Sequence, residues 1–256
     1  MAKNAWIASR ARAAAPRLRL YCFPYAGRGA SLYARWESLL GPGVEVCPVQ
    51  LPGREDRLDE PPARRMSGIV DRFLADVGPE LDRPFAFFGY SMGGVVAFEI
   101  ARRLQAAGAR SPELLFVSAS RPPGTHKQAK TYELPDAALV AELRRWNGTP
   151  EIVLREPDLL RMVLPIVRAD LELLYHYEPP ANAALTCPIF AMGGTRDPQL
   201  PVPLLSRWRD FTRERFDLQM FDGDHFFINA NPGAIQALVG SELGKRFVDA
   251  SLARAS

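Results

Sequence analysis

Short apolar runs recur along the chain and alternate with stretches that have helical periodicity. The runs are only four to six residues long, which suits buried strands better than helices. Strands that alternate with helices predict a largely parallel sheet with helices on both faces, which is the α/β class. The expected strands cover residues 18–23, 44–49, 85–88, 114–117, 188–192 and 216–221.

The segment from about Arg121 to Pro180 is the exception, because it contains no convincing strand. Helical patterns run over residues 139–146 and 159–177, between two proline-rich ends. An insertion between two strands of such a sheet is expected to lie over the strand ends, where α/β proteins bind their ligands. The sequence therefore predicts a helical lid over residues 121–180, although helices that merely pack on the sheet give the same pattern.

A Gly-x-Ser-x-Gly sequence follows the third expected strand and leads directly into an apolar helical stretch. Ser91 stands at its centre, between Gly89 and Gly93. A serine at a sharp strand-to-helix turn has a strained backbone, and the glycines avoid collisions with the neighbouring strand and helix. The five-residue pattern alone also occurs in ordinary turns. Because a strand precedes it and a helix follows it, we predict that Ser91 is a nucleophile.

A serine hydroxyl attacks near neutral pH only with the help of a base and a carboxylate. The chain has three histidines, His126, His176 and His225. In the chain order serine, acid, histidine, the base follows the last strand. Only His225 has this position, because it comes directly after the strand expected at residues 216–221.

Asp197 is the expected acid, because it follows the strand expected at residues 188–192. An aspartate before a proline is also ordinary in turns. Asp222 and Asp224 are closer to His225 in sequence, but either would reach the ring only if the loop folded back on itself. The acid would hold the imidazole in one tautomer and stabilise the imidazolium without taking the proton.

Acyl transfer also needs backbone N–H groups that stabilise the developing oxyanion. One usually comes from the residue after the nucleophile, which is Met92, and one from a loop after an early strand. The glycine-containing loop at residues 23–30 has this position. We predict Ala26 as the second donor, with Tyr25 as the alternative.

Length and composition are typical of one α/β domain over residues 1–256, with a short flexible tail at 1–16. The chain is 47% hydrophobic, which is enough for one large core. No apolar run approaches the ~20 residues that span a bilayer, and the beginning lacks the apolar region of a secretory leader. We therefore expect a cytoplasmic protein that does not bind membranes. We also expect a monomer.

Charge and cysteine content exclude further classes. The net charge of +3 is too small to indicate nucleic-acid binding. The three cysteines, Cys22, Cys47 and Cys187, lie on or beside expected strands and lack the paired spacing of metal ligands. We expect them to be reduced thiols in the core, and we expect neither a metal nor a cofactor.

Several segments resemble those of the stand-alone type II thioesterases that accompany polyketide and nonribosomal peptide synthetases, members of the α/β-hydrolase superfamily. The similarity covers roughly residues 17–246. It is carried by residues 22–27 (CFPYAG), 50–57 (QLPGREDR), 88–94 (FGYSMGG), 164–165 (LP), 168–170 (RAD) and 223–226 (GDHF). Together these segments are far more specific than any one of them.

The resemblance implies a catalytic triad of Ser91, Asp197 and His225, an oxyanion hole formed by Met92 and Ala26, and a mobile lid. It also implies the substrate, an acyl group held as a thioester on the phosphopantetheine arm of an acyl or peptidyl carrier protein. The implied role is editing, the removal of stalled or wrongly primed acyl groups from a synthetase.

Two positions depart from the family pattern without removing a catalytic group. Arg28 stands where a second glycine is expected after Gly27, and Tyr90 stands where many relatives carry histidine. Three other functions stay open: a chain-releasing thioesterase or cyclase, a small-molecule carboxylesterase, and a noncatalytic binding protein. Release domains usually follow a carrier domain, whereas this sequence starts at Met1, which favours the editor. The complete triad argues against a noncatalytic protein.

Overall fold

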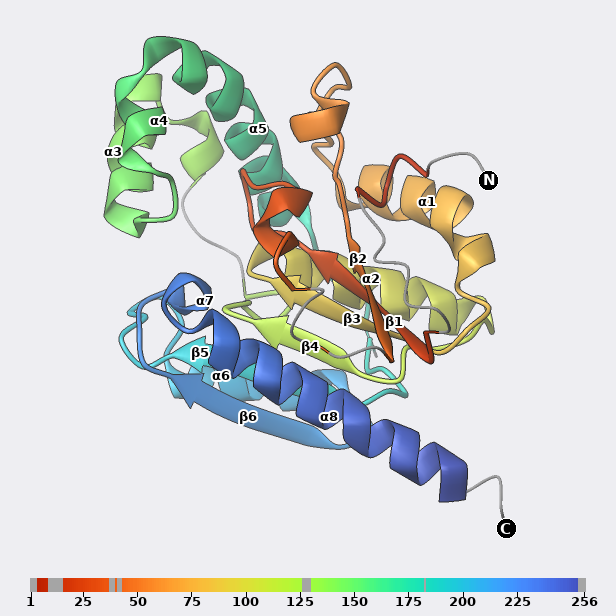
Figure 1. The fold of residues 1–256 in the computed structure, drawn as a ribbon. Coiled ribbons are helices and arrows are strands. Elements are labelled where there is room, and N and C mark those ends of the chain that lie inside the picture. Colours follow the sequence, from red (N-terminus) through yellow and green to blue (C-terminus); the bar gives the residue numbers. More distant parts are fainter. Residues whose placement is uncertain are drawn as a thin grey trace.

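Six parallel strands form one sheet in the order β2-β1-β3-β4-β5-β6 (Figure 1). The structure is a computed structural model that describes residues 4–8, 16–36, 40, 43–125, 130–181 and 183–252. The strands confirm the expected ones, with ends that shift by one or two residues at most. They are β1 (Leu18–Phe23), β2 (Val44–Pro48), β3 (Phe85–Tyr90), β4 (Leu115–Ser118), β5 (Ile189–Gly194) and β6 (Phe216–Phe221).

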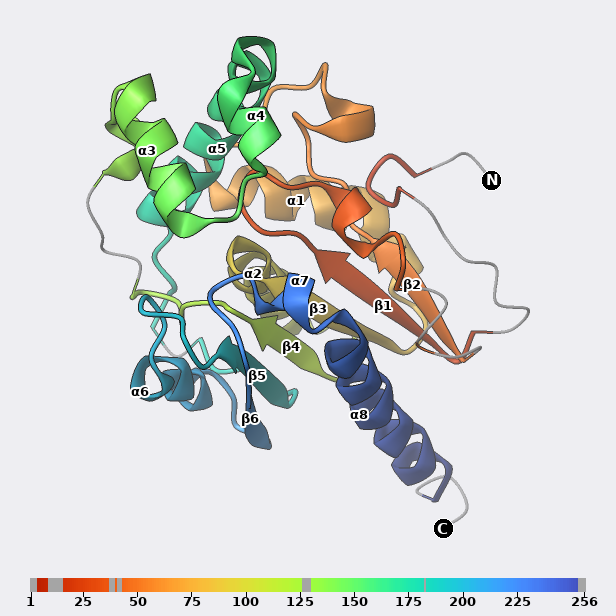
Figure 2. The same ribbon diagram turned by 60° about the vertical axis from the view of Figure 1, so that its left-hand side comes forward.

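Helices cover both faces of this sheet, as the alternation of strands and helices predicts (Figures 1 and 2). Helices α1 (Met66–Val77) and α2 (Met92–Ala106) pack on one face, and α8 (Pro232–Leu252) packs on the other. Neighbouring residues of a strand point to opposite faces. Phe87 therefore belongs to the core beneath α1 and α2, whereas Phe88 packs against Trp36 on the α8 side.

The remaining short elements lie in the connections. They are η1 (Ala30–Tyr33), η2 (Glu55–Arg57), η3 (Gly78–Glu80), η4 (Thr131–Glu133), α6 (Val202–Leu205), η5 (Ser206–Phe211) and α7 (Phe227–Ala230).

Cys22, Cys47 and Cys187 are buried free thiols, which confirms the expectation for them. Within the described ranges, no helix combines the length and the apolar character needed to cross a membrane.

A helical insertion separates β4 from β5 and lies beyond the carboxyl ends of the strands (Figure 2). It consists of α3 (Asp136–Trp146), α4 (Glu151–Arg155) and α5 (Pro157–His176). These helices bury a small apolar cluster of their own, formed by Leu139, Leu143, Leu154, Leu164 and Val167. The predicted helical character of residues 121–180 is therefore confirmed for the part of this segment that the structure describes.

The beginning of the chain differs in part from the expected flexible tail. Residues 4–8 pack on the domain, because the Trp6 ring is buried and its indole N–H donates to Asp76 at 2.8 Å. Ile7 forms an antiparallel bridge with Val49 next to β2, and the guanidinium of Arg57 lies over the Trp6 ring. A large aromatic ring thus anchors this segment. Residues 1–3 and 9–15 lie outside the described residues.

Candidate active site

Ser91 stands at the turn from β3 into α2 with a strained backbone, at φ 51° and ψ −114°. This positive φ is costly for any residue other than glycine. The turn fits only because its neighbours have no side chain. A Cβ on Gly89 would lie 2.3 Å from the Gly93 carbonyl oxygen, and a Cβ on Gly93 would lie 2.2 Å from that of Phe23. The expected sharp strand-to-helix turn is therefore present, with Ser91 at its tip.

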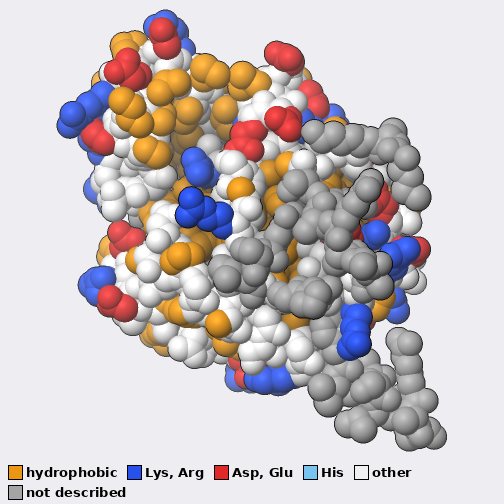
Figure 3. All heavy atoms as spheres, viewed as in Figure 1, with side chains coloured by type: hydrophobic (Ala, Val, Ile, Leu, Met, Phe, Trp, Pro, Cys, Tyr) orange, Lys and Arg blue, Asp and Glu red, His pale blue; other side chains and the backbone are white. Residues whose placement is uncertain are grey.

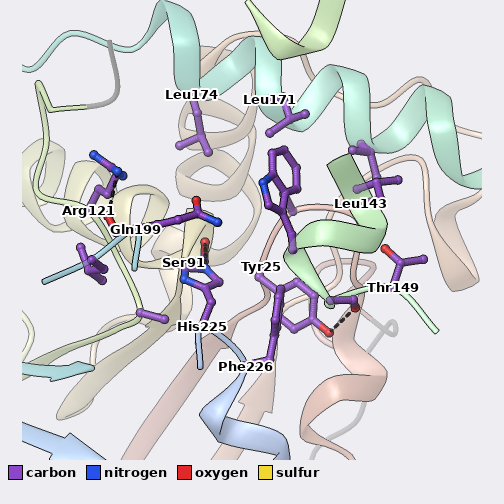
Figure 4. A pocket seen from close by; sticks show the side chains of 16 residues that line it. Tyr25, Ser91, Arg121, Leu143, Thr149, Leu171, Leu174, Gln199, His225 and Phe226 are labelled. Carbon is purple, nitrogen blue, oxygen red and sulfur yellow. Dashed lines mark hydrogen bonds between the residues drawn. The ribbon is translucent and has the colours of Figure 1, made fainter. Parts of the chain in front are cut away.

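The structure brings Ser91, His225 and Asp197 together from three separate loops, and Figure 4 shows Ser91 and His225 facing each other. His225 Nε2 lies 3.2 Å from Ser91 Oγ, and His225 Nδ1 lies 2.6 Å from Asp197 Oδ2. The side chain of Asp197 is fully buried, whereas that of His225 remains 20% exposed toward the site. With Nδ1 donating to the carboxylate, Nε2 is free to accept the Ser91 proton.

The surroundings of Asp197 keep its carboxylate ionised. Burial alone would raise the pKa of Asp197, but the hydrogen bond with His225, the Gln199 amide and the charge of Arg121 together hold that pKa below its usual value. The Gln199 N–H donates to Oδ1 at 2.9 Å, and Arg121 donates in turn to the Gln199 carbonyl at 2.7 Å. These two residues belong to the site but had no distinguishing signal in the sequence.

The other candidate acids do not reach the histidine ring. Asp222 is exposed and pairs with Arg196, and the Asp224 carboxylate accepts the N–H of Phe226 at 2.8 Å. Of the other histidines, His176 stacks edge-on against Tyr175 at the end of α5, and His126 lies outside the described residues.

Tyr90 connects the serine turn to the histidine loop. Its hydroxyl donates to the backbone carbonyl of His225 at 2.5 Å and accepts the N–H of Ile228 at 3.5 Å. Burial raises the pKa of Tyr90 well above its usual value, so the phenol stays protonated and keeps donating. The departure from histidine at this position thus leaves a side chain that binds the segment carrying His225.

The two expected oxyanion donors, Met92 and Ala26, both belong to segments next to Ser91. Met92 is the first residue of α2, where backbone N–H groups have no partner within the helix. Ala26 lies on the loop after β1 and lines the same cavity as Ser91, as does the alternative donor Tyr25. Tyr25 is also held from the insertion side, because its hydroxyl donates to the Gly148 carbonyl at 3.4 Å.

A cavity of about 140 Å³ opens beside Ser91 between the sheet and the insertion (Figure 4). One end carries the polar groups of Ser91, His225, Arg121 and Gln199. Its remaining wall is largely apolar and is formed by Leu143, Trp146, Val167, Leu171, Leu174, Leu200 and Phe226. Such a cavity suits a small apolar group attached to an electrophilic centre at Ser91.

Arg54 and Asp170 form a buried ion pair next to the loop that bears Ala26, and the sequence did not predict them as a pair. Both residues lie in segments that carry the family resemblance, but nothing in the sequence pairs two positions 116 residues apart.

Among the described residues, no group of three or more His, Cys, Asp or Glu side chains has a metal-binding arrangement. The expectation of no metal and no cofactor stays a prediction.

Known proteins are similar to this chain in both sequence and fold. The family model for the thioesterase domain matches residues 18–241. Gramicidin S biosynthesis protein GrsT of Aneurinibacillus migulanus is 38% identical over 226 residues, which cover 88% of each chain. Among solved structures, the RedJ thioesterase of the prodiginine pathway in Streptomyces coelicolor has a TM-score of 0.84 at 35% identity, covering 90% of this chain and 87% of RedJ.

A type II thioesterase has the same fold. BorB, from the borrelidin biosynthetic cluster, has a TM-score of 0.84 at 33% identity, covering 95% of this chain and 99% of BorB. The sheet with its flanking helices thus has the α/β-hydrolase fold of these thioesterases. The chain belongs to the thioesterase family and is a hydrolase of thioesters, similar to the type II thioesterases of polyketide and nonribosomal peptide pathways.

Proposed function

We propose that this thioesterase hydrolyses acyl groups from the phosphopantetheine arm of acyl or peptidyl carrier proteins, and that it edits a polyketide or nonribosomal peptide synthetase. The observation that carries the proposal is the chain of hydrogen bonds from Asp197 through His225 to Ser91, at the mouth of a largely apolar cavity. A thioester carbonyl at Ser91 would leave its acyl chain against the apolar wall. The relatives named for gramicidin S, prodiginine and borrelidin biosynthesis support the carrier-bound substrate.

The reaction proceeds in two acyl transfers. His225 Nε2 takes the proton of Ser91 Oγ as that oxygen attacks the thioester carbonyl, and the Ala26 and Met92 amides stabilise the oxyanion. The C–S bond then breaks, and the pantetheine sulfur leaves as a thiolate that takes the proton from His225. Water, activated by the same histidine, hydrolyses the acyl-Ser91 ester and releases the acid.

The helical insertion acts as a lid over this reaction. It contributes Leu143, Trp146, Val167 and Leu171 to the cavity wall, and its Asn147 and Gly148 lie against the loop that bears His225. A Cβ on Gly148 would lie 2.0 Å from the Phe226 ring, so the two loops are in close contact. Opening this contact would admit the pantetheine arm to Ser91.

The direct test compares acyl groups of two and eight carbons on a carrier protein, on coenzyme A and as oxygen esters. We expect the carrier thioesters to react fastest, with both chain lengths accepted. Ser91→Ala and His225→Ala should each lower kcat by about 10⁴-fold or more, whereas His176→Ala, at an exposed histidine of the insertion, should not.

Each part of the proposal can fail separately. Equal rates on oxygen esters would identify a carboxylesterase and remove the carrier-bound substrate. A strict preference for one long chain would favour a chain-releasing enzyme over an editor. An active Ser91→Ala or His225→Ala variant would contradict the triad itself.

A further inference from the structure

The loop that bears Ala26 is a tight turn that side chains from other segments hold in place. The Arg28 N–H donates to the Tyr25 carbonyl at 3.0 Å, and Gly27 has a φ of +79°. A bond between residues i and i+3 with a glycine of positive φ at i+2 is typical of a type II turn. In such a turn the central peptide, here between Ala26 and Gly27, can flip unless another group holds it.

Three buried side chains hold this turn and the residues after it. Asp170 Oδ2 accepts the Gly27 N–H at 2.8 Å. Arg54 Nη1 donates to the Arg28 carbonyl at 3.3 Å, and Gln50 Oε1 accepts the Ala30 N–H at 3.0 Å. Backbone groups on both sides of the turn thus have side-chain partners from the segment at residues 50–54 and from α5.

Arg54 and Asp170 are themselves locked together. Their side chains are 4% and 0% exposed, and Arg54 Nη1 and Nη2 donate to the two Asp170 oxygens at 2.7 and 2.8 Å. A bidentate pair of this kind fixes orientation as well as distance. Packing adds to it, because α5 also brings Val167 so close to Gly27 that a Cβ there would lie 2.8 Å from its methyl group.

The Ala26 amide contrasts with these neighbours. Among the described residues, no group accepts a hydrogen bond from the Ala26 N–H, although Ala26 lines the cavity together with Ser91. The adjacent peptide is therefore tied down by Asp170, while the amide before it remains available to an incoming ligand. This division suits a donor that must be preorganised before the reaction.

We propose that Asp170, oriented by Arg54, is a positioning residue for the oxyanion donor of Ala26. The inference rests on the proposed function, in which Ala26 stabilises the oxyanion. Asp170 touches neither substrate nor reacting atoms; it acts by fixing the turn. Because Asp170 lies on α5, the insertion contributes to transition-state stabilisation as well as to the cavity wall.

Two double variants of similar volume separate positioning from stability. Arg54→Gln with Asp170→Asn removes both charges but leaves a carbonyl oxygen that can accept the Gly27 N–H. Arg54→Met with Asp170→Leu removes the charges and the acceptor. We expect the apolar pair to lose about 100-fold in kcat with KM within a few-fold, since small misplacements of catalytic groups cost this much. The polar pair should keep kcat within about tenfold of the parent.

The affinity for a transition-state analogue is a second measurement, and a merely structural role of Asp170 would not change it. A trifluoromethyl ketone analogue of the acyl-pantetheine forms a hemiketal with Ser91 whose oxyanion occupies the same hole. Its affinity for the apolar pair should fall by about the same factor as kcat/KM, whereas an amide analogue of the substrate should bind unchanged. Tyr177→Phe is the matched control, because it removes a buried hydrogen bond to Glu99, made by the residue directly after α5, that does not touch the turn.

Melting temperatures and near-ultraviolet circular dichroism show whether each variant is folded. If the apolar pair does not fold, Asp170→Glu replaces it, because that residue keeps the charge but displaces the acceptor. An unchanged kcat in the apolar pair or in Asp170→Glu would overturn the inference, and so would a loss that Tyr177→Phe reproduces. The two proposals can fail independently. If Ser91→Ala is inactive and Asp170→Glu is fully active, the role of Asp170 is refuted and the assignment of the triad stands.

Discussion

The parallel sheet and the helical insertion both line the cavity at Ser91, but different interactions hold them in place. The central strands β1, β3 and β4 are almost entirely buried, with apolar clusters on both faces. The insertion has a small apolar cluster of its own, and α5 joins the sheet domain through Leu173 in the main core and through buried polar contacts. These include the Arg54–Asp170 pair and the Gly27 N–H that donates to Asp170; just after α5, the Tyr177 hydroxyl also donates to Glu99 at 2.8 Å.

This difference separates two tasks. The proposed nucleophile, base and acid all follow strands of the sheet, whose hydrogen bonds and packing leave little freedom. The apolar part of the cavity wall comes mostly from the helices of the insertion. Substitutions of the triad residues should therefore change the rate of the chemistry. Substitutions of insertion residues that line the cavity should change which acyl group is accepted, whereas Asp170, which does not line the cavity, should affect the rate.

The largest expected effect comes from the acid on the sheet. Asp197→Asn should lower kcat by about 10⁴-fold, because an amide favours the wrong tautomer of His225 and cannot stabilise the imidazolium. Steady-state kinetics with a carrier thioester measure the loss. Asp222→Asn is the matched control at the exposed aspartate that pairs with Arg196, and it should keep full activity. Equal losses in both variants would mean that Asp197 is not the acid.

The same variant has a signature in stability. The pKa of Asp197 is lowered in the folded protein, so its contribution to the free energy of unfolding is present above the unfolded pKa of about 3.9 and is lost as pH falls through the folded pKa. Asparagine does not titrate. Unfolding of Asp197→Asn should therefore depend less on pH below about pH 4 than unfolding of the parent. Chemical denaturation at pH 3 and pH 6 measures the difference.

The same contrast explains what the sequence predicts and what it does not. The residues Ser91, Asp197 and His225 could be located because each follows a short apolar run, and chain order assigns the roles. The Arg54–Asp170 pair could not, because it joins an irregular loop to a helix of the insertion, and no periodicity relates the two. The buried Trp6 was missed for a similar reason: its partners, Asp76 and Arg57, are contacts of the folded chain.

A smaller effect, on selectivity, is expected from the insertion. Trp146 is the last residue of α3 and lines the cavity, so Trp146→Ala should lengthen the space for the acyl chain. We expect kcat/KM for an eight-carbon chain to rise relative to a two-carbon chain by about tenfold, the effect of roughly one methylene group in an apolar pocket. Ile152→Ala is the control, because Ile152 is 63% exposed on α4. An unchanged ratio would exclude Trp146 as a determinant of chain length.

The smallest effect tests whether the loops that follow the strands need side-chain support of their own. Tyr90→Phe removes the hydroxyl that donates to the His225 carbonyl, leaving that carbonyl without this buried partner. We expect a loss of about 1 kcal/mol in the free energy of unfolding. The catalytic loss should be only about threefold to tenfold in kcat, at an unchanged KM, because the Asp197 hydrogen bond still orients the ring.

Tyr177→Phe should show a comparable loss of stability with an unchanged kcat. The Tyr177 hydroxyl donates to Glu99, and neither residue lines the cavity. If both variants lose kcat equally, Tyr90 acts only through overall stability. If Tyr90→Phe alone loses kcat, packing after β6 is not sufficient to hold His225, and the hydroxyl at this position supplies the missing constraint. The rigidity that packing gives the strands would then not extend to every loop that follows them.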